Sequence, residues 1–179
     1  MNKFWNNPRI PVLLFCFIAI AGIHVHTKLW HWNKDPKKAE IYYVFVEGTR
    51  LINGVNPYER VLSGDMRNSD KYAVYFPLSY IVSGFTQLAG WKTFPEWLAF
   101  WRVIFLEFNI GICYLIFKIC ADRKAPLLGI FGALFWLFNR WTLHVTLINH
   151  LDFVALFLLI FSLSLVPRRF NLACIMFGI

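Results

Sequence analysis

Long apolar runs separated by short charged segments dominate the chain and predict several membrane-embedded helices. A bilayer core of about 30 Å needs roughly 20 consecutive apolar residues in a helix. The uncharged or nearly uncharged stretches are Ile10–Thr27, Tyr72–Trp91, Val103–Phe117, Ala125–Asn139, Phe153–Pro167 and the shorter Phe170–Ile179. We therefore expect an all-α fold, a polytopic transmembrane bundle of five or six helices, with a long external loop that carries amphipathic interfacial helices.

The runs also set the expected boundaries within a single integral-membrane domain at 1–179. They predict a first span at 10–27, an external segment at 28–96 with interfacial or re-entrant helices, further spans at 97–118, 125–140 and 150–167, and an incomplete span at 170–179. Because the last run is too short to cross a bilayer, we interpret the chain as the N-terminal part of a longer protein.

The segment Lys28–Lys71 differs from the rest because it holds eight Lys and Arg and six Asp and Glu residues. Within it, apolar and small residues recur at helical spacing between Ile41 and Ile52, and we place Glu47 and Arg50 on the other side of that helix. This pattern predicts an amphipathic helix lying along the membrane surface. In Tyr72–Trp91, Pro77 and Gly84 interrupt the run, so we expect no single perpendicular span there.

The positive residues in short loops predict the orientation of the chain. Short cytoplasmic loops carry an excess of Lys and Arg, whereas loops longer than about 60 residues escape this rule. If 28–96 is external, the basic residues of the N-terminal segment and of two short loops lie inside: Lys3, Arg9, Lys118, Arg123, Lys124, Arg168 and Arg169. The same arrangement places Arg140–Asp152, which we expect to form a turn, on the external face.

Composition supports a membrane location and argues against other classes. The chain is 58% hydrophobic and only 16% charged, whereas soluble domains are about 25% charged. The net charge of +8 is distributed between apolar runs and not gathered on one face, so we expect membrane lipids and no nucleic acid as partners. The cysteines lie in apolar stretches without metal-ligand spacing and are expected to be packed thiols. They are Cys16, Cys113, Cys120 and Cys174.

Three histidines near the end of the first run, His24, His26 and His31, raise the question of a metal site. His-x-His at a helix end does not place both rings on one face, and no carboxylate completes a ligand set. We therefore expect no metal and interpret these residues as amphipathic rings at the membrane interface. His150 and Asp152 are stronger candidates for chemistry, because an irregular helix start there would let both line one cavity.

Three motifs carry a resemblance to a known family: Glu40-Ile41-Tyr42-Tyr43, the run Gly48–Tyr58, and Tyr75-Phe76-Pro77-Leu78. In them the sequence resembles the polyprenol-phosphate-sugar-dependent glycosyltransferases of the C-type membrane fold, in particular the bacterial mannosyltransferase-like branch. That branch has Asp-Phe-x-x-Tyr-Tyr, Gly-x-x-Leu-Leu-x-Gly-x-x-Pro-Tyr and Tyr-Pro-Pro-Leu motifs. A Gly-Gln-x-Asn or Gly-His-x-Asp turn follows them.

The resemblance assigns the family's acidic position to Glu40, seventeen residues before Pro57, and the later turn to Asn149-His150-Leu151-Asp152. The chain departs from the pattern where Glu40 replaces Asp, Phe76 replaces the first box proline and Asn149 replaces glycine. The general base therefore stays open between Glu40 and Asp35.

The resemblance implies an integral-membrane hexosyltransferase of the cell membrane. It would move a hexose, with mannose the family default, from a polyprenyl-phosphate sugar to a lipid or glycan acceptor on the external face. The lipid-linked donor is a co-substrate, and no other cofactor is implied. Such transfer needs a carboxylate to accept the acceptor's proton and cationic or hydrogen-bonding groups for the leaving phosphate. The expected substrate-binding residues are Arg50, Tyr58, Arg60, Lys71, Tyr75, His150 and Asp152.

Two non-enzymatic alternatives remain. In a transporter or lipid-handling subunit, Arg102, Glu107 and Asp152 would line a permeation path, because charges at membrane depth mark a pairing or a functional cavity. A structural assembly partner would need no carboxylate cavity at all. The enzyme hypothesis differs from both alternatives because it predicts acidic groups of the external segment beside the Tyr75-Phe76-Pro77-Leu78 motif.

Overall fold

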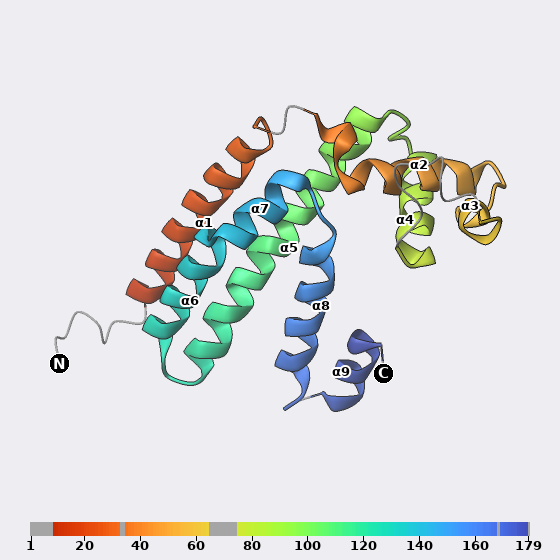
Figure 1. Ribbon diagram of the computed structural model, residues 1–179. Helices are drawn as coiled ribbons and strands as arrows, with labels where there is room; N and C mark the ends of the chain where they lie inside the picture. The colour runs from red at the N-terminus through yellow and green to blue at the C-terminus, as the bar shows by residue number, and fades with distance from the viewer. Residues whose placement is uncertain (1–8, 33–34, 65–74, 168, 179) are drawn as a thin grey trace. The chain divides into compact units, whose positions relative to one another are not determined.

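The computed structural model describes residues 9–32, 35–64, 75–167 and 169–178, and all regular elements in these ranges are helices (Figure 1). The expected all-α class is confirmed. The elements are α1 (Arg9–Leu29), the 3-10 helix η1 (Pro36–Lys38), α2 (Glu40–Ile52), α3 (Glu59–Leu62), α4 (Pro77–Leu88), α5 (Phe94–Asp122), α6 (Pro126–Phe138), α7 (Arg140–Ile148), α8 (Asp152–Leu165) and α9 (Phe170–Phe177).

The chain forms two compact units. We call Met1–Asn33 with Ile104–Ile179 the bundle unit and Lys34–Val103 the insert unit. Helix α5 begins in the insert unit and continues into the bundle unit.

Two helices have the length and apolar character to cross a membrane among the described residues. They are α1, with 21 residues, and α5, with 29. The other apolar helices of the bundle unit are shorter: α6 has 13 residues and α8 has 14, so each extends only about 20 Å. That further helices of the chain also cross the membrane therefore remains a prediction.

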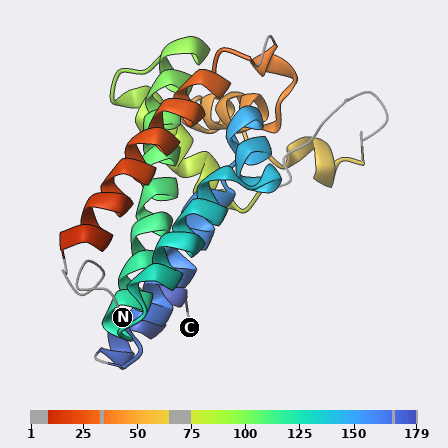
Figure 2. The ribbon, with the colours of Figure 1, turned by 90° about the vertical axis from the view of Figure 1, so that its left-hand side faces the viewer.

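The core of the bundle unit forms where α1, α5 and α6 run side by side (Figure 2). Its buried cluster includes Ile18 of α1, Cys113 of α5 and Leu137 of α6. A Cβ atom on Gly22 would lie 2.8 Å from Leu137 Cδ1, and one on Gly129 would lie 2.9 Å from the Phe117 carbonyl oxygen. Glycine at these points lets the helices approach closely, as small residues do in membrane bundles.

Five described basic residues of the bundle unit lie at one end, which we call the basic end, whereas Lys28 and Arg140 lie toward the other end. Helix α1 begins there, α5 ends there, α6 begins there and α8 ends there (Figures 1 and 2). The described basic residues at these helix ends are Arg9, Lys118, Arg123, Lys124 and Arg169. This distribution is the one expected if the basic end faces the cytoplasm.

The insert unit is built on a close crossing of α2 and α4. A Cβ atom on Gly48 would lie 2.5 Å from Ser83 Oγ, and one on Gly84 would lie 3.2 Å from the Gly48 carbonyl oxygen. Gln87 spans the crossing: its Nε2 donates to the Phe45 carbonyl oxygen at 2.9 Å, and its Oε1 accepts from Thr49 Oγ1 at 2.7 Å. These bonds satisfy a side chain that is almost fully buried.

The predicted amphipathic helix exists as α2, but its buried face differs from the expected one. Ile41, Val44, Glu47 and Gly48 are buried, and Glu47 is 0% exposed. Val44 follows Ile41 by three positions, and Glu47 and Gly48 follow Val44 by three and four, so the buried face of α2 includes the glutamate. Placing Glu47 on the opposite side was therefore wrong. Arg50 Nη1 lies 3.7 Å from Glu47 Oε2 and partly offsets the buried charge.

Helix α4 covers only part of the run Tyr72–Trp91. It begins at Pro77, a residue suited to the first helical position, and ends at Leu88 after 12 residues. Such a helix is about 18 Å long, too short to cross a bilayer core. Within residues 75–91, this short helix agrees with our expectation that the run does not form one continuous span. Residues 72–74 lie outside the described part.

The segment expected to be a turn, 140–152, contains the nine-residue helix α7. Asn139 caps its first turn, because its Oδ1 accepts from the backbone N–H groups of Trp141 and Thr142 at 2.9 and 3.1 Å. Asn149 ends the helix with a left-handed φ of 56°, which asparagine tolerates better than most residues. The polar residues thus mark the two ends of a helix and not one open turn.

Candidate functional site

A carboxylate and three tyrosines from separate segments meet in the insert unit. Glu40 is the first residue of α2, and its Oε2 accepts a hydrogen bond from the Tyr75 hydroxyl at 2.8 Å. Tyr75 lies just before α4, 35 positions along the chain from Glu40. The first and the third of the three motifs that carry the resemblance therefore meet in one hydrogen bond.

Tyr58 and Tyr80 hold the backbone of Tyr75 in place. The Tyr58 hydroxyl donates to the Tyr75 carbonyl oxygen at 2.6 Å, and the Tyr75 N–H donates to the Tyr80 hydroxyl oxygen at 2.9 Å. The rings of Tyr58 and Tyr80 meet edge to face with centroids 5.7 Å apart. Burial raises the pKa of the Tyr58 phenol above its ordinary value.

The turn after α2 returns the chain so that Tyr58 can reach this position. Gly54 has a φ of +77°, a conformation that glycine adopts without strain, and the N–H of Val55 donates to the Arg50 carbonyl oxygen at 2.9 Å. Asn56 Oδ1 then accepts from the Tyr58 N–H at 3.0 Å, the bond of an Asx turn.

The cluster has the properties of a proton-accepting site at a surface. The Glu40 side chain is exposed, so a second molecule can reach it. It lies in the first turn of α2, where the helix dipole favours a negative charge. An exposed carboxylate oriented by a phenol can accept a proton from a bound hydroxyl group.

Among the other candidate residues of the insert unit, Arg50 lies apart from this cluster. Arg50 lies ten positions from Glu40 on the same helix, about 15 Å along the axis, and pairs with Glu47. Asp35 is exposed just before η1 and forms no side-chain capping bond there. Arg60 belongs to α3, but its side chain lies outside the described part of the structure, as does all of Lys71.

His150 and Asp152 pair with each other in the bundle unit. His150 Nδ1 lies 2.7 Å from Asp152 Oδ1, with side chains 21% and 64% exposed. The left-handed conformation of Asn149 ends α7 just before this pair, and Asp152 begins α8. That these two residues share a cavity with Glu40 stays a prediction.

Sequence reasoning missed a buried polar network around His26. The ring is 0% exposed and packs inside the bundle unit, whereas an interfacial ring of the expected kind would be partly exposed. Its Nδ1 lies 2.7 Å from Thr146 Oγ1, and its Nε2 lies 3.0 Å from the Leu137 carbonyl oxygen. Because a carbonyl oxygen only accepts, Nε2 carries a proton.

Two further side chains complete this network. Asn109 Nδ2 approaches the His26 ring nitrogens at 3.4 and 3.5 Å, and Asn109 Oδ1 accepts from Trp136 Nε1 at 2.7 Å. Thr146 Oγ1 also lies 3.0 Å from the Thr142 carbonyl oxygen. The network joins α1, α5, α6 and α7. Asn109, Thr142 and Thr146 interrupt otherwise apolar helices, which was the available sequence signal.

The described residues contain no group of three or more His, Cys, Asp or Glu side chains arranged to hold a metal ion. All four cysteines are free thiols, and Cys113 is completely buried.

Comparisons with known proteins found no match: no family description fits the chain, and no curated protein or solved structure is significantly similar to it.

Proposed function

We propose that the protein is an integral-membrane glycosyltransferase that moves a hexose, with mannose as the first candidate, from a polyprenyl-phosphate sugar to a lipid or glycan acceptor. The observation that carries the proposal is the 2.8 Å hydrogen bond from the Tyr75 hydroxyl to Glu40 Oε2. It joins the acidic position of the resembled pattern to its aromatic box, as the enzyme hypothesis requires.

The chemistry assigns Glu40 the role of general base. The carboxylate accepts the proton of the acceptor hydroxyl while that oxygen attacks the anomeric carbon, and the bond from this carbon to the donor phosphate breaks. One carboxylate is sufficient for such an inverting displacement. Tyr75 orients this carboxylate through its hydroxyl group, and the exposed position of Glu40 leaves room for an acceptor.

The membrane location supports a lipid-linked donor. Helices α1 and α5 are long and apolar enough to cross a bilayer, and a polyprenyl chain is confined to that environment. In this proposal the protein is a multi-pass protein of the cell membrane, and the insert unit works at its external surface. His150 and Asp152 contribute to binding of the donor or acceptor.

Replacing the proposed base tests the function directly. The full-length protein is reconstituted with radiolabelled polyprenyl-phosphate mannose and a mixed lipid acceptor fraction, and transfer and donor binding are measured separately. Glu40→Gln keeps the size and hydrogen-bonding capacity of the side chain but cannot accept the proton. We expect transfer to fall by about 10²–10⁴-fold with donor binding retained.

Asp35→Asn is the matched control, because it neutralises a second exposed carboxylate near the start of α2. It should leave transfer near the wild-type rate. If Asp35→Asn abolishes transfer and Glu40→Gln does not, Asp35 is the base. If neither variant loses transfer, or the wild-type protein transfers no sugar, the carboxylate mechanism is wrong and a non-enzymatic membrane role is favoured.

A further inference from the structure

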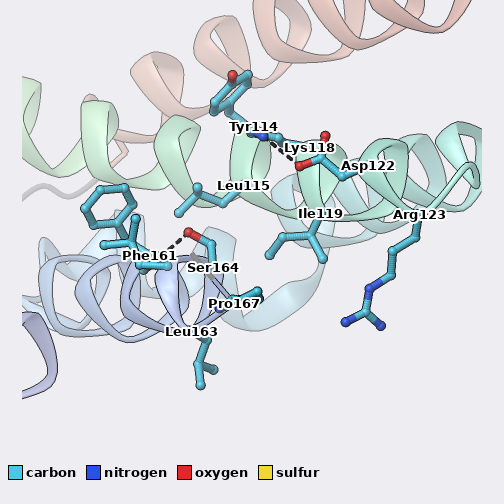
Figure 3. A pocket seen from close by; sticks show the side chains of 11 residues that line it. Tyr114, Leu115, Lys118, Ile119, Asp122, Arg123, Phe161, Leu163, Ser164 and Pro167 are labelled. Atoms are coloured by element: carbon cyan, nitrogen blue, oxygen red, sulfur yellow. Dashed lines mark hydrogen bonds and ion pairs between the residues drawn. The ribbon is translucent and has the colours of Figure 1, made fainter. Parts of the chain in front are cut away.

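A groove at the basic end of the bundle unit lies between the last turns of α5 and α8. It has a volume of about 470 Å³. Its walls are mainly apolar, with Leu115 and Ile119 pointing from α5 toward α8 (Figure 3). No residue of the Glu40 cluster and neither His150 nor Asp152 lines it.

Helices α5 and α8 pack closely around Gly111 of α5, and the groove lies beyond this contact. A Cβ atom on Gly111 would lie 2.7 Å from Phe157 Cε2, and the rings of Phe108 and Phe157 meet edge to face at 5.1 Å. Beyond this contact the two helices diverge toward the basic end (Figure 1). The hollow is lined by residues of the last turns of α5 and α8 and of the turns that follow them: Tyr114, Leu115, Lys118, Ile119, Asp122, Arg123, Phe161, Leu163, Ser164, Leu165 and Pro167.

The rim of the groove is positively charged. Lys118 Nζ lies 2.7 Å from Asp122 Oδ2, so these two charges largely offset each other. Arg123 adds a cation that extends away from the helix end (Figure 3), and Lys124 and Arg169 are exposed at the same end. After Asp122 the sequence contains one further acidic residue, Asp152, which begins α8 at the opposite end.

We propose that this groove binds an anionic phospholipid, with its phosphate beside Arg123 and an acyl chain along Leu115 and Ile119. The ligand needs both an apolar part and a negative charge, because apolar walls lead to a cationic rim. A free anion would leave the walls uncovered. A packed protein helix would have to bury the Lys118–Asp122 pair, which costs desolvation energy. The inference rests on the membrane location in the proposed function and not on sugar transfer.

Native mass spectrometry of the full chain in a neutral detergent tests this site. The probes are phosphatidylglycerol and phosphatidylcholine with identical acyl chains, and the controls are circular dichroism and size-exclusion profiles of each variant. We expect phosphatidylglycerol to bind more tightly. Arg123→Gln should weaken its binding about five-fold, the effect of about one basic residue near an anionic lipid.

Arg140→Gln is the charge-matched control, because Arg140 is an exposed arginine at the other end of α6. It should leave phosphatidylglycerol binding unchanged. Ile119→Trp places bulk in the groove without altering charge and should also reduce binding. Glycerol phosphate in millimolar excess should not compete, since it lacks the acyl chain.

The inference is overturned if both lipids bind equally, if Arg140→Gln weakens binding as much as Arg123→Gln, or if Ile119→Trp has no effect. Competition by glycerol phosphate would replace it with a small-anion site. Glu40→Gln separates the two proposals, because it should abolish transfer and leave phosphatidylglycerol binding intact.

Discussion

At the scale of single residues, the buried histidine is the feature with the clearest energetic consequence. Leu137 lies in the last turn of α6, where carbonyl groups have no intrahelical partner. The proton on His26 Nε2 satisfies this carbonyl oxygen inside an apolar bundle. A side chain that cannot donate there leaves the Leu137 oxygen and the Thr146 hydroxyl with fewer partners.

We therefore predict that His26→Leu lowers the free energy of unfolding by about 1–3 kcal/mol, the usual cost of leaving a buried polar group unsatisfied. For a chain of this size the thermal midpoint should fall by about 2–4 °C for each kcal/mol. The measurement is thermal unfolding in detergent. His24→Leu, at an exposed position of the same helix, is the control and should stay near the wild-type midpoint. Equal midpoints for the two variants would contradict a structural role for the network.

The residue scale also shows why the sequence was a partial guide. The contact between Glu40 and Tyr75 was expected from motif spacing, because the resemblance linked both positions to one site. The burial of Glu47 and His26 was not expected, because it depends on packing against segments distant in the chain. Periodicity identifies that a helix has two faces, but the packing partner decides which face is buried.

At the scale of elements, the crossing of α2 and α4 decides whether the insert unit keeps its tyrosine cluster. Glu40 belongs to α2, and Tyr75 and Tyr80 lie at the start of α4, so the spacing of these helices sets the Glu40–Tyr75 distance. The crossing has no room for a larger residue at Gly48.

We predict that Gly48→Ala destabilises the insert unit by about 1–3 kcal/mol, because overpacking forces the helices apart. Ser83→Gly removes the atoms that the new methyl group would meet, so the double variant should recover part of the loss. Limited proteolysis in the insert unit and thermal unfolding measure both effects. If the double variant loses as much free energy of unfolding as the two single variants together, the contact between Gly48 and Ser83 does not limit stability.

Helix boundaries were predictable where the chain is apolar. The segment expected at 10–27 is the core of α1, 97–118 lies within α5, and 125–140 and 150–167 contain α6 and α8. Helix α7 was missed because its alternating Thr, His and apolar residues show no strong helical stripe, and the capping contribution of Asn139 depends on the conformation of the chain.

At the scale of the whole molecule, the charge distribution predicts sidedness. Five described basic residues of the bundle unit share one end, and the positive-inside tendency predicts that this end faces the cytoplasm. The segment that we predict to be external contains the candidate base, which fits the proposed transfer from a donor on the outer face.

We predict that single cysteines at positions 53 and 123, in a variant without the four native cysteines, react with a membrane-impermeant maleimide from opposite faces. Asn53 and Arg123 are both exposed, so access to the reagent does not limit either reaction. The experiment uses intact and permeabilised cells. Labelling of both positions in intact cells would reverse the assignment of the basic end.

The network around His26 has one further consequence, which follows from counting its hydrogens. Thr146 has a single hydroxyl hydrogen and two neighbouring acceptors, the Thr142 carbonyl oxygen and the unprotonated Nδ1 of a neutral His26 ring. A neutral ring takes that hydrogen, and a ring protonated at Nδ1 returns it to the Thr142 carbonyl oxygen. The hydrogen bonds of Thr146 can therefore be satisfied in either protonation state of the ring by rotating one hydroxyl group, with no heavy atom changing position.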